Sequence, residues 1–299
     1  MADFVLNQTP LLSRSTLDRA EHLRSDTGAL QQGWASALVL RVNRRSQARV
    51  DDASLVLDPA TGDAPPEDAV FLGVDHERHI WAVRDDSVDG DLRDLRAVGA
   101  VLDDTQAGML TTAVGLLFWH GKSKFSAIDG TPTKLVNAGW SRVSETGNEE
   151  FPRSDPAVIC LVHDGADRVL LARQHSWPET MLSILAGFAE VGESLETCVR
   201  REILEEVGVD VTDVRYLGSQ PWPFPRSLML GFAAVADPEQ PLEFKDGEIA
   251  EAHWFTRAEV RAALAAGDWS TAPVGRLRLP GSISIARVIL ESWAATTGS

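Results

Sequence analysis

The chain has 299 residues, of which 44% are hydrophobic, so it is long enough for two domains with substantial cores. Its 44 acidic residues outnumber its 28 basic ones, and the net charge of -16 opposes non-specific binding to nucleic acid. Residues 1–26 lack an apolar run of signal-peptide length, and no stretch reaches the length of a membrane span, so we expect a cytoplasmic protein with no membrane partner.

The first third of the chain reads as a small β-rich domain. Residues 1 to about 35 contain no pattern from which a helix or a strand can be predicted. Short runs rich in Val and Leu, separated by polar or Gly/Pro segments, predict strands at residues 36–42, 53–58, 69–75 and 79–84. The spacing then becomes helical between Asp103 and Trp119, with Asp103 or Asp104 as the cap. We therefore predict an amino-terminal domain over residues 1–119, closed by this helix.

Residues 120–153 are polar and rich in turn formers, which predicts a connector or small module. The remaining residues, 154–299, alternate strands with helices. A hairpin is predicted at 156–162 and 169–174, followed by strands at 214–219 and 228–235, a strand leading into a helix at 251–264, and a last helix at about 283–295. This order predicts an α/β sandwich around a mixed sheet.

The stretch from Gly187 to Val209 contains the strongest local pattern. Ser194 is a plausible N-cap, Gly208 occupies the C-cap position, and apolar residues recur every four positions at Leu195, Val199, Ile203 and Val207. An amphipathic helix is predicted, with its apolar stripe packed on one side.

Three carboxylates, Glu202, Glu205 and Glu206, form a second stripe on this helix, because residues three and four apart share a face. Like charges this close repel one another unless cations neutralise them, which favours a site for magnesium or manganese. Arg201 can hold a carboxylate through a bidentate contact, and Gly187 lets the preceding loop approach closely. The alternative is a solvated helix face, the usual fate of a charge run.

The full spacing of Gly187, Glu193, Arg201, the three glutamates and Gly208 resembles the Nudix box of the Nudix hydrolases, with every signature position filled. The resemblance implies an α/β/α sandwich that hydrolyses nucleoside diphosphates linked to another group, with divalent metals and an attacking water. It implies catalytic roles for Arg201, Glu202, Glu205 and Glu206. It also implies metal ligands at Ala186 (through its carbonyl), Glu202, Glu205, Glu206 and Glu248, with Glu251 as the residue that a one-position alignment slip would choose instead.

Beyond the helix, residues 219–229 read SQPWPFPRSLM. Three prolines alternating with two aromatic residues cannot sit in the interior of a sheet, which predicts a stiff loop with aromatic faces. The alternative is a loop whose aromatic side chains fill the core. The run is similar to the motif that marks NADH pyrophosphatases, where it lines the dinucleotide pocket. That resemblance implies substrate contacts at Gln220, Pro221, Trp222, Pro223, Phe224, Pro225, Arg226 and Ser227, and further ones at Phe151, Phe188, Ala286 and Arg96.

The connector departs from that family, which carries a zinc ribbon built from two Cys-x-x-Cys pairs. The positions that look equivalent here are Ser126, Asp129, Ser144 and Gly147. Structural zinc requires sulfur and imidazole ligands, so we expect no structural zinc and only a degenerate ribbon, with His120 and His163 as ordinary packed or surface residues. The two cysteines, Cys160 and Cys198, lie in apolar surroundings and are expected to be packed thiols.

The resemblance implies that the chain hydrolyses NAD(H) to NMN(H) and AMP, and it leaves open the removal of NAD caps from RNA. The acidic balance suggests that only the cap end of such an RNA would be held. The alternatives are a pyrophosphatase for ADP-ribose or another nucleoside-diphosphate derivative, and a Nudix-derived sensor that binds without cleaving. By analogy with the family, a homodimer is expected.

Overall fold

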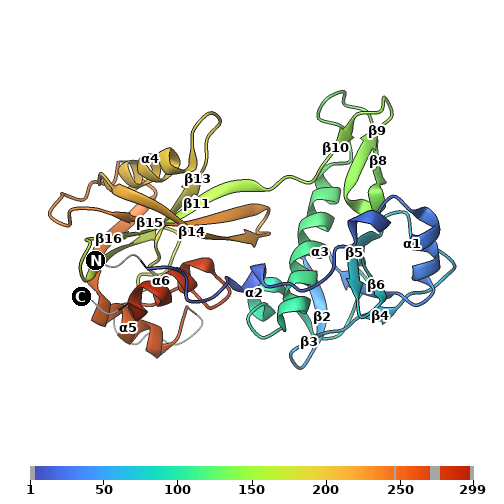
Figure 1. Cartoon of the computed structure of the whole chain (residues 1–299), viewed down its shortest axis with the longest axis horizontal. Helices are drawn as coiled ribbons and strands as arrows, with labels where there is room; N and C mark the ends of the chain where they lie inside the picture. The colour runs from blue at the N-terminus through green and yellow to red at the C-terminus, as the bar shows by residue number, and fades with distance from the viewer. Residues whose placement is uncertain (1–3, 246, 270–276, 297–299) are drawn as a thin grey trace. The chain divides into compact units, whose positions relative to one another are not determined.

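The computed structural model describes residues 4–245, 247–269 and 277–296. The chain forms two compact units, each described by itself. The amino-terminal unit comprises Arg14–Ser154 and Trp222–Arg226, and the carboxyl-terminal unit comprises Met1–Ser13, Asp155–Pro221 and Ser227–Ser299. In Figure 1 the colours follow the chain through both. Among the described residues, no helix combines the length and apolar character needed to cross a membrane.

A seven-stranded sheet and a long helix make up most of the amino-terminal unit. The sheet has the path β3-β2-β1-β6-β5, with β4 paired to β1 and β7 to β2. Its strands are β1 (Leu38–Val42), β2 (Gln47–Asp51), β3 (Ser54–Leu55), β4 (Asp58–Pro59), β5 (Val70–Asp75), β6 (Arg78–Arg84) and β7 (Leu92–Asp94), and the helices are α1 (Thr27–Trp34), α2 (Leu95–Val98) and α3 (Asp104–Lys122). The predicted strands at 36–42, 69–75 and 79–84 are confirmed. The single strand predicted at 53–58 is wrong, because that segment forms the separate two-residue strands β3 and β4.

Helix α3 confirms the predicted helical spacing. Its N-cap is Asp103, whose carboxylate accepts a hydrogen bond of 2.8 Å from the main-chain nitrogen of Gln106. Its apolar face, which includes Met109, Ala113 and Leu117, is buried. After α3, the connector folds into a three-stranded antiparallel sheet of β8 (Thr133–Val136), β9 (Ser141–Ser144) and β10 (Glu149–Glu150), with a short turn of 3₁₀ helix at Asn137–Gly139. Figure 1 shows this small sheet at the end of α3 remote from α2.

The carboxyl-terminal unit is built on a six-stranded mixed sheet with the path β14-β15-β11-β12-β16 and β13 paired to β11. The strands are β11 (Asp155–His163), β12 (Arg168–Gln174), β13 (Leu185–Phe188), β14 (Thr212–Trp222), β15 (Ser227–Val235) and β16 (Ile249–Thr256), and the helices are α4 (Leu195–Val207), α5 (Arg257–Ala266) and α6 (Ile285–Ala295). Strands β11 and β15 run parallel, whereas β11 and β12 form the predicted hairpin. The mixed sheet is therefore confirmed.

Alternate residues of β11 serve two hydrophobic cores, because successive side chains of a strand point to opposite faces of the sheet. Ile159 and Leu161 pack in the core with residues of α5 and α6. Val158 and Cys160 pack in the other core with residues of α4. Figure 1 shows α4 on one face of this sheet and α5 and α6 on the other. The unit is thus the expected α/β/α sandwich.

The compact units divide the chain differently from the predicted 1–119, 120–153 and 154–299. The described residues before Ser13 pack on the carboxyl-terminal unit: Phe4 is buried in the core of α5 and α6, and the main-chain nitrogen of Asn7 donates to the hydroxyl of Ser292 at 3.0 Å. The connector groups with the amino-terminal unit. Local sequence pattern could not reveal either association, because each depends on contacts between distant parts of the chain.

Candidate active site

Helix α4 forms where the caps predict it. The hydroxyl of Ser194 accepts a hydrogen bond of 3.2 Å from the main-chain nitrogen of Thr197, which satisfies one of the free donors at the start of the helix. Gly208 ends the helix with φ of 75°, in the left-handed region that glycine adopts without strain. Val199, Ile203 and Val207 are buried against the sheet, so the acidic residues between them take fixed positions.

Arg201, near the middle of α4, gathers the acidic residues around it. Its guanidinium binds Glu193 in a bidentate manner, with Nε at 3.1 Å and Nη2 at 2.6 Å from the two carboxylate oxygens. Nη1 donates to Glu202 at 2.9 Å and to Glu205 at 3.0 Å, and Nη2 also donates to the carbonyl of Phe188. The predicted bidentate contact is present, and its partner is Glu193. Arg201 thus ties the preceding loop to the acidic stripe.

Glu202 lies directly against the main chain of β13. A Cβ atom on Gly187 would stand 1.9 Å from the carboxyl carbon of Glu202, so only glycine leaves room for that carboxylate. Burial raises the pKa of Glu202, and the neighbouring charges of Glu205 and Glu193 act in the same direction, although Arg201 opposes them. An approaching cation would relieve this cost.

The other glutamates of the stripe differ in exposure. Glu206 is buried, with 3% of its surface exposed, whereas the side chain of Glu205 is 54% exposed. Glu248 is exposed in the segment before β16. Glu251 forms an ion pair of 2.5 Å with Arg173, so its carboxylate already serves a structural contact.

Within the described ranges, no three His, Cys, Asp or Glu side chains are gathered around one point as metal ligands. The contacts of Arg201 account for this, because Glu202 and Glu205 both turn toward its guanidinium. Arg201 uses one oxygen of each carboxylate, and a carboxylate offers two. The donor set is made of hard oxygen atoms, which fit magnesium or manganese and do not fit a soft metal.

The aromatic motif corrects the prediction of a loop over residues 219–229. Strand β14 continues through Trp222, β15 begins at Ser227, and only residues 223–226 form the turn. Strand β14 lies at the edge of the sheet, where Pro221 can be accommodated because an edge strand leaves some N–H groups unpaired. The prolines therefore avoid the sheet interior as predicted, but the prediction is wrong for residues 227–229, which belong to the interior strand β15.

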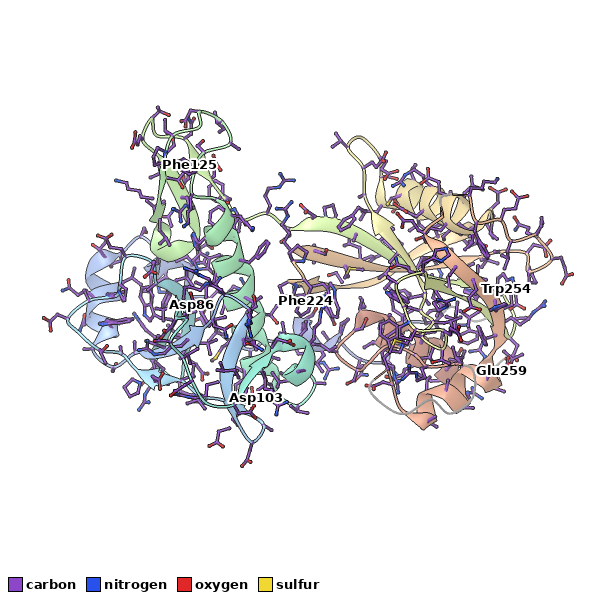
Figure 2. The ribbon with its side chains drawn as sticks, turned by 180° about the vertical axis from the view of Figure 1, so that it is seen from behind. Asp86, Asp103, Phe125, Phe224, Trp254 and Glu259 are labelled. Atoms are coloured by element: carbon purple, nitrogen blue, oxygen red, sulfur yellow. The ribbon has the colours of Figure 1, made fainter. Side chains whose placement is uncertain are left out.

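The tip of the motif belongs to the amino-terminal unit. The rings of Trp222 and Phe224 meet edge to face with centroids 4.9 Å apart, and the guanidinium carbon of Arg96 lies 4.2 Å from the centroid of Phe224, which is labelled in Figure 2. The nearest atom to a Cβ added at Gly115 of α3 would be Pro223, at 4.0 Å. Arg96, related to the substrate site by resemblance alone, here supports an aromatic residue of the motif.

The other predicted substrate residues fall into three groups by exposure. Phe188 and Phe151 are exposed, at 58% and 62%, and are open to a ligand or a partner. Gln220 is fully buried and its amide donates to the carbonyl of Ile283 at 3.0 Å, so this side chain holds the segment before α6 instead of facing solvent. Ser227 and Ala286 are also buried. Pro225 is exposed, and Pro221 and Arg226 are partly exposed.

The four ribbon positions of the connector contain a hydrogen-bonded network centred on Asp129. Its carboxylate accepts hydrogen bonds from Thr131, Ser144, Thr146 and Asn148, among them 2.9 Å from the Ser144 hydroxyl and 2.7 Å from the Asn148 amide. These bonds hold the pKa of Asp129 well below its usual range, the one from Thr146 most of all. The hydroxyl of Ser126 accepts from the main chain of Ile128 at 3.1 Å. The set contains no sulfur or imidazole ligand and does not fit tetrahedral zinc.

Both cysteines are buried free thiols, as predicted. Burial raises the pKa of Cys198 to about 12 and also raises that of Cys160, so neither is a reactive thiolate. His163 is buried. His120 accepts a hydrogen bond from Arg142 at Nδ1 and donates from Nε2 to the carbonyl of Gly139.

Comparison with known proteins agrees with this geometry. Residues 153–274 match the NUDIX domain, and residues 17–119 match the NADH pyrophosphatase-like rudimentary NUDIX domain. The chain is 59% identical to the NAD-capped RNA hydrolase NudC of Mycobacterium tuberculosis, over 98% of this chain and 97% of that protein. It is 35% identical to the human mitochondrial NAD(P)H pyrophosphatase NUDT13, over 76% of this chain and 71% of that protein.

Proposed function

The chain belongs to the Nudix hydrolases that carry an NADH pyrophosphatase-like amino-terminal domain, and from this premise we propose that it hydrolyses the pyrophosphate bond of NAD(H), giving NMN(H) and AMP. The observation that carries the proposal is the arrangement of Glu193, Glu202 and Glu205 around Arg201, with Glu202 seated on Gly187. The names of both relatives, an NAD-capped RNA hydrolase and an NAD(P)H pyrophosphatase, support this substrate class.

Magnesium or manganese is the proposed cofactor, held by the oxygen atoms of Glu202, Glu205, Glu206, Glu248 and the carbonyl of Ala186. When bound, such an ion neutralises the pyrophosphate and lowers the pKa of a water molecule. The protein's own part is to present the carboxylates in a fixed arrangement. Arg201 orients Glu202 and Glu205, while Glu205 or Glu206 orients the attacking water or takes its proton.

The flat rings of the dinucleotide call for aromatic contacts. We assign them to Trp222, Phe224 and the exposed Phe188, with Arg226 supplying a positive charge for the phosphates. Gln220, Ser227 and Ala286, which the resemblance also implies, are buried, and Gln220 holds the segment before α6 through its bond to the carbonyl of Ile283. A second copy of the chain is the expected partner. In such a homodimer the exposed Phe151 of one copy is proposed to contact the base of the dinucleotide bound to the other copy.

The connector is proposed to hold its fold without zinc. The network around Asp129 occupies the ribbon positions and satisfies the carboxylate with hydroxyl and amide donors. Metal analysis of the purified chain is the direct measurement, and one tightly held zinc ion per chain would contradict the proposal.

Product analysis tests the function. NADH incubated with the chain and magnesium or manganese should yield NMNH and AMP in equal amounts, with no turnover after chelation of the divalent metal. A stronger preference for ADP-ribose in a competition assay would change the substrate assignment, and binding of NADH without products would indicate a sensor. An RNA carrying a 5′ NAD cap, assayed in parallel, tests the removal of caps.

A further inference from the structure

A basic cavity of about 930 Å³ lies in the amino-terminal unit. Its charged lining residues are the cations Arg44, Arg84, Lys122, Lys124 and Arg142 and the anion Asp68. Five positive charges against one negative charge leave +4, in a chain whose net charge is -16. His120 also lines the cavity, and burial lowers its pKa to about 4, so it adds no charge near pH 7. The cavity is thus opposite in sign to the whole chain.

Four parts of the amino-terminal unit supply these cations. Lys122 ends α3 and Lys124 follows it, Arg142 comes from β9, Arg84 ends β6, and Arg44 lies in the turn between β1 and β2. Figure 1 shows the end of α3 beside the small sheet that contains β9. The carbonyl end of a helix favours cations and disfavours anions, so α3 alone would not attract a negative ligand. The excess of lysine and arginine reverses that preference.

Most of these cations are not neutralised by acidic side chains. Arg44 forms an ion pair of 2.8 Å with Asp86, which is labelled in Figure 2. Among the described residues, the ion pairs include none of the other four cations. Arg84 donates to the carbonyl of Asn43 instead. Burial lowers the pKa of Arg84, and the charge of Arg44 lowers it further, although Asp86 acts in the opposite direction.

Arg142 has a structural role that explains its own position. It donates to the hydroxyl and the carbonyl of Thr133 at 2.7 Å each, and to His120 at 3.0 Å. The bonds to Thr133 join β9 to β8, the bond to His120 links the small sheet to α3, and none of these partners is an acid. No such role accounts for Lys122 and Lys124, which are exposed. Arg84 and Arg142 are partly buried, and like charges in such positions repel one another. An entering anion would offset the free-energy cost of that repulsion.

An exposed aromatic ring stands next to the lysines in sequence. Phe125 follows Lys124 directly, is 64% exposed, and forms an isolated bridge with Pro132 ahead of β8. Figure 2 labels it in the amino-terminal unit. Cations that follow a phosphate backbone, combined with an aromatic face on which a base can stack, are the usual elements of a single-strand binding surface. A small anion would need the cations but not the ring.

We propose that this basic cavity, together with Phe125, binds the phosphates and a base of single-stranded RNA, the chain that continues from an NAD cap. The inference rests on the proposed function only in naming the RNA. It departs from the expectation that only the cap end of the RNA is held, because this cavity is basic although the whole chain is acidic. A free phosphate or nucleotide shares part of this chemistry, so the experiment must separate it from RNA.

The test measures binding of a fluorescent, uncapped 12-nucleotide RNA to the full chain by anisotropy at several salt concentrations. The double variant Lys122→Gln/Lys124→Gln should bind about tenfold more weakly at low salt, and the slope of log K against log salt should fall by about 1.4, since each phosphate contact on a single strand contributes about 0.7. Phe125→Ala should weaken binding about fivefold or more without changing the slope. The matched control is Arg45→Gln/Lys134→Gln, which removes two exposed charges of the same unit that do not line the cavity.

Equal binding by the lysine variant and the control would overturn the proposal. So would displacement of the RNA by inorganic phosphate or AMP at matched phosphate concentration, which would indicate a small-anion site. Turnover of NADH should be the same in the lysine variant as in the wild type, while the KM for NAD-capped RNA rises and kcat stays constant. If the wild type fails to cleave NADH, the proposed function falls, yet the oligonucleotide measurement still decides the binding site.

Discussion

Arg201 binds Glu193 through two parallel hydrogen bonds, and this contact ties the loop before α4 to the helix that carries the acidic stripe. Glu193 also accepts a hydrogen bond of 2.7 Å from the main-chain nitrogen of Glu190, which closes the loop on itself. The site's geometry depends on this pair, although neither residue needs to touch the substrate.

The pair predicts a pH dependence of stability. The hydrogen bond from Arg201 lowers the pKa of Glu193 from 4.5 to about 2. A carboxylate whose pKa is lowered on folding stabilises the protein above its unfolded pKa, and that contribution is lost as the pH falls toward the folded pKa. Glu193→Gln should therefore be less stable than the wild type at pH 7, with the difference constant to about pH 5 and shrinking below 4.5. Urea unfolding at pH 7, 5, 4 and 3 measures it, with the exposed Glu196→Gln as control.

Gly187→Ala should disable the site while leaving the fold intact. The new Cβ would meet the carboxyl carbon of Glu202 at 1.9 Å and displace that carboxylate. We expect kcat/KM for NADH to fall about 100-fold, since misplacing a group by about 1 Å costs this much. Gly121→Ala is the control, because nothing lies within 4 Å of its added Cβ. Circular dichroism should show that both variants are folded. If Gly187→Ala keeps the wild-type kcat/KM, Glu202 is not part of the active site.

Glu206→Gln keeps the shape of a buried side chain and removes its charge. If Glu206 holds metal or orients the water, kcat should fall about 1,000-fold, within the range for loss of a general base. The free energy of unfolding should change little. Glu196→Gln in the first turn of the same helix is the matched control. Retained turnover would show that the charge on Glu206 is not needed.

Arg96→Ala should weaken substrate binding with little effect on the chemical step. Its guanidinium lies over the ring of Phe224, and an exposed contact of this kind contributes about 0.5–1 kcal/mol. The KM for NADH should rise about two- to fivefold while kcat stays constant. The control is Arg93→Ala, whose side chain pairs with Asp91 in the same segment. A change in kcat alone would place Arg96 in the chemical step instead.

Asp129→Asn tests the connector. The lowered pKa of Asp129 means that the charged form is stabilised by folding, so the contribution is present above its unfolded pKa of 3.8 and declines as the pH falls below it. At pH 7 the variant should melt several degrees below the wild type, and the difference should begin to narrow only below about pH 3.8, as the pH falls toward the folded pKa. A strong zinc chelator should leave the wild-type Tm unchanged. The exposed Glu145→Gln is the control, and a chelator-sensitive wild type would show that zinc holds the connector.

Local pattern predicted those elements whose signals are themselves local. The box helix had both caps and an apolar repeat, and β11, β12 and β15 were apolar runs bounded by turns. Helix α1 was not predicted, because its eight residues include two glycines and a helix so short depends on packing, here of Leu30 and Trp34. Strand β2 was also missed, although Ala48 and Val50 alternate with polar residues as in a half-buried strand.

The site residues divide in the same way, into those with a local sequence signal and those whose contacts come from distant parts of the chain. The spacing identified Arg201 as a carboxylate partner but did not single out Glu193, since several acids lie within its reach. The positions of Gln220 against Ile283 and of Arg96 over Phe224 depend on segments far apart in the chain. Periodicity carries no information about such pairs, and only the folded structure reveals which polar side chains hold the protein together and which remain available.

Phe4 and Trp293 are buried in the same core, which has a consequence for biosynthesis. Phe4 lies before residues 14–154 in the sequence and Trp293 lies after them, so the carboxyl-terminal unit cannot complete this core until α6 has been synthesised. The intervening residues 14–154 can collapse earlier, needing only Trp222–Arg226 from later in the chain. Until α6 has been made, Phe4 cannot be buried in this core, so its segment stays exposed to solvent and to non-native contacts while the nascent chain grows.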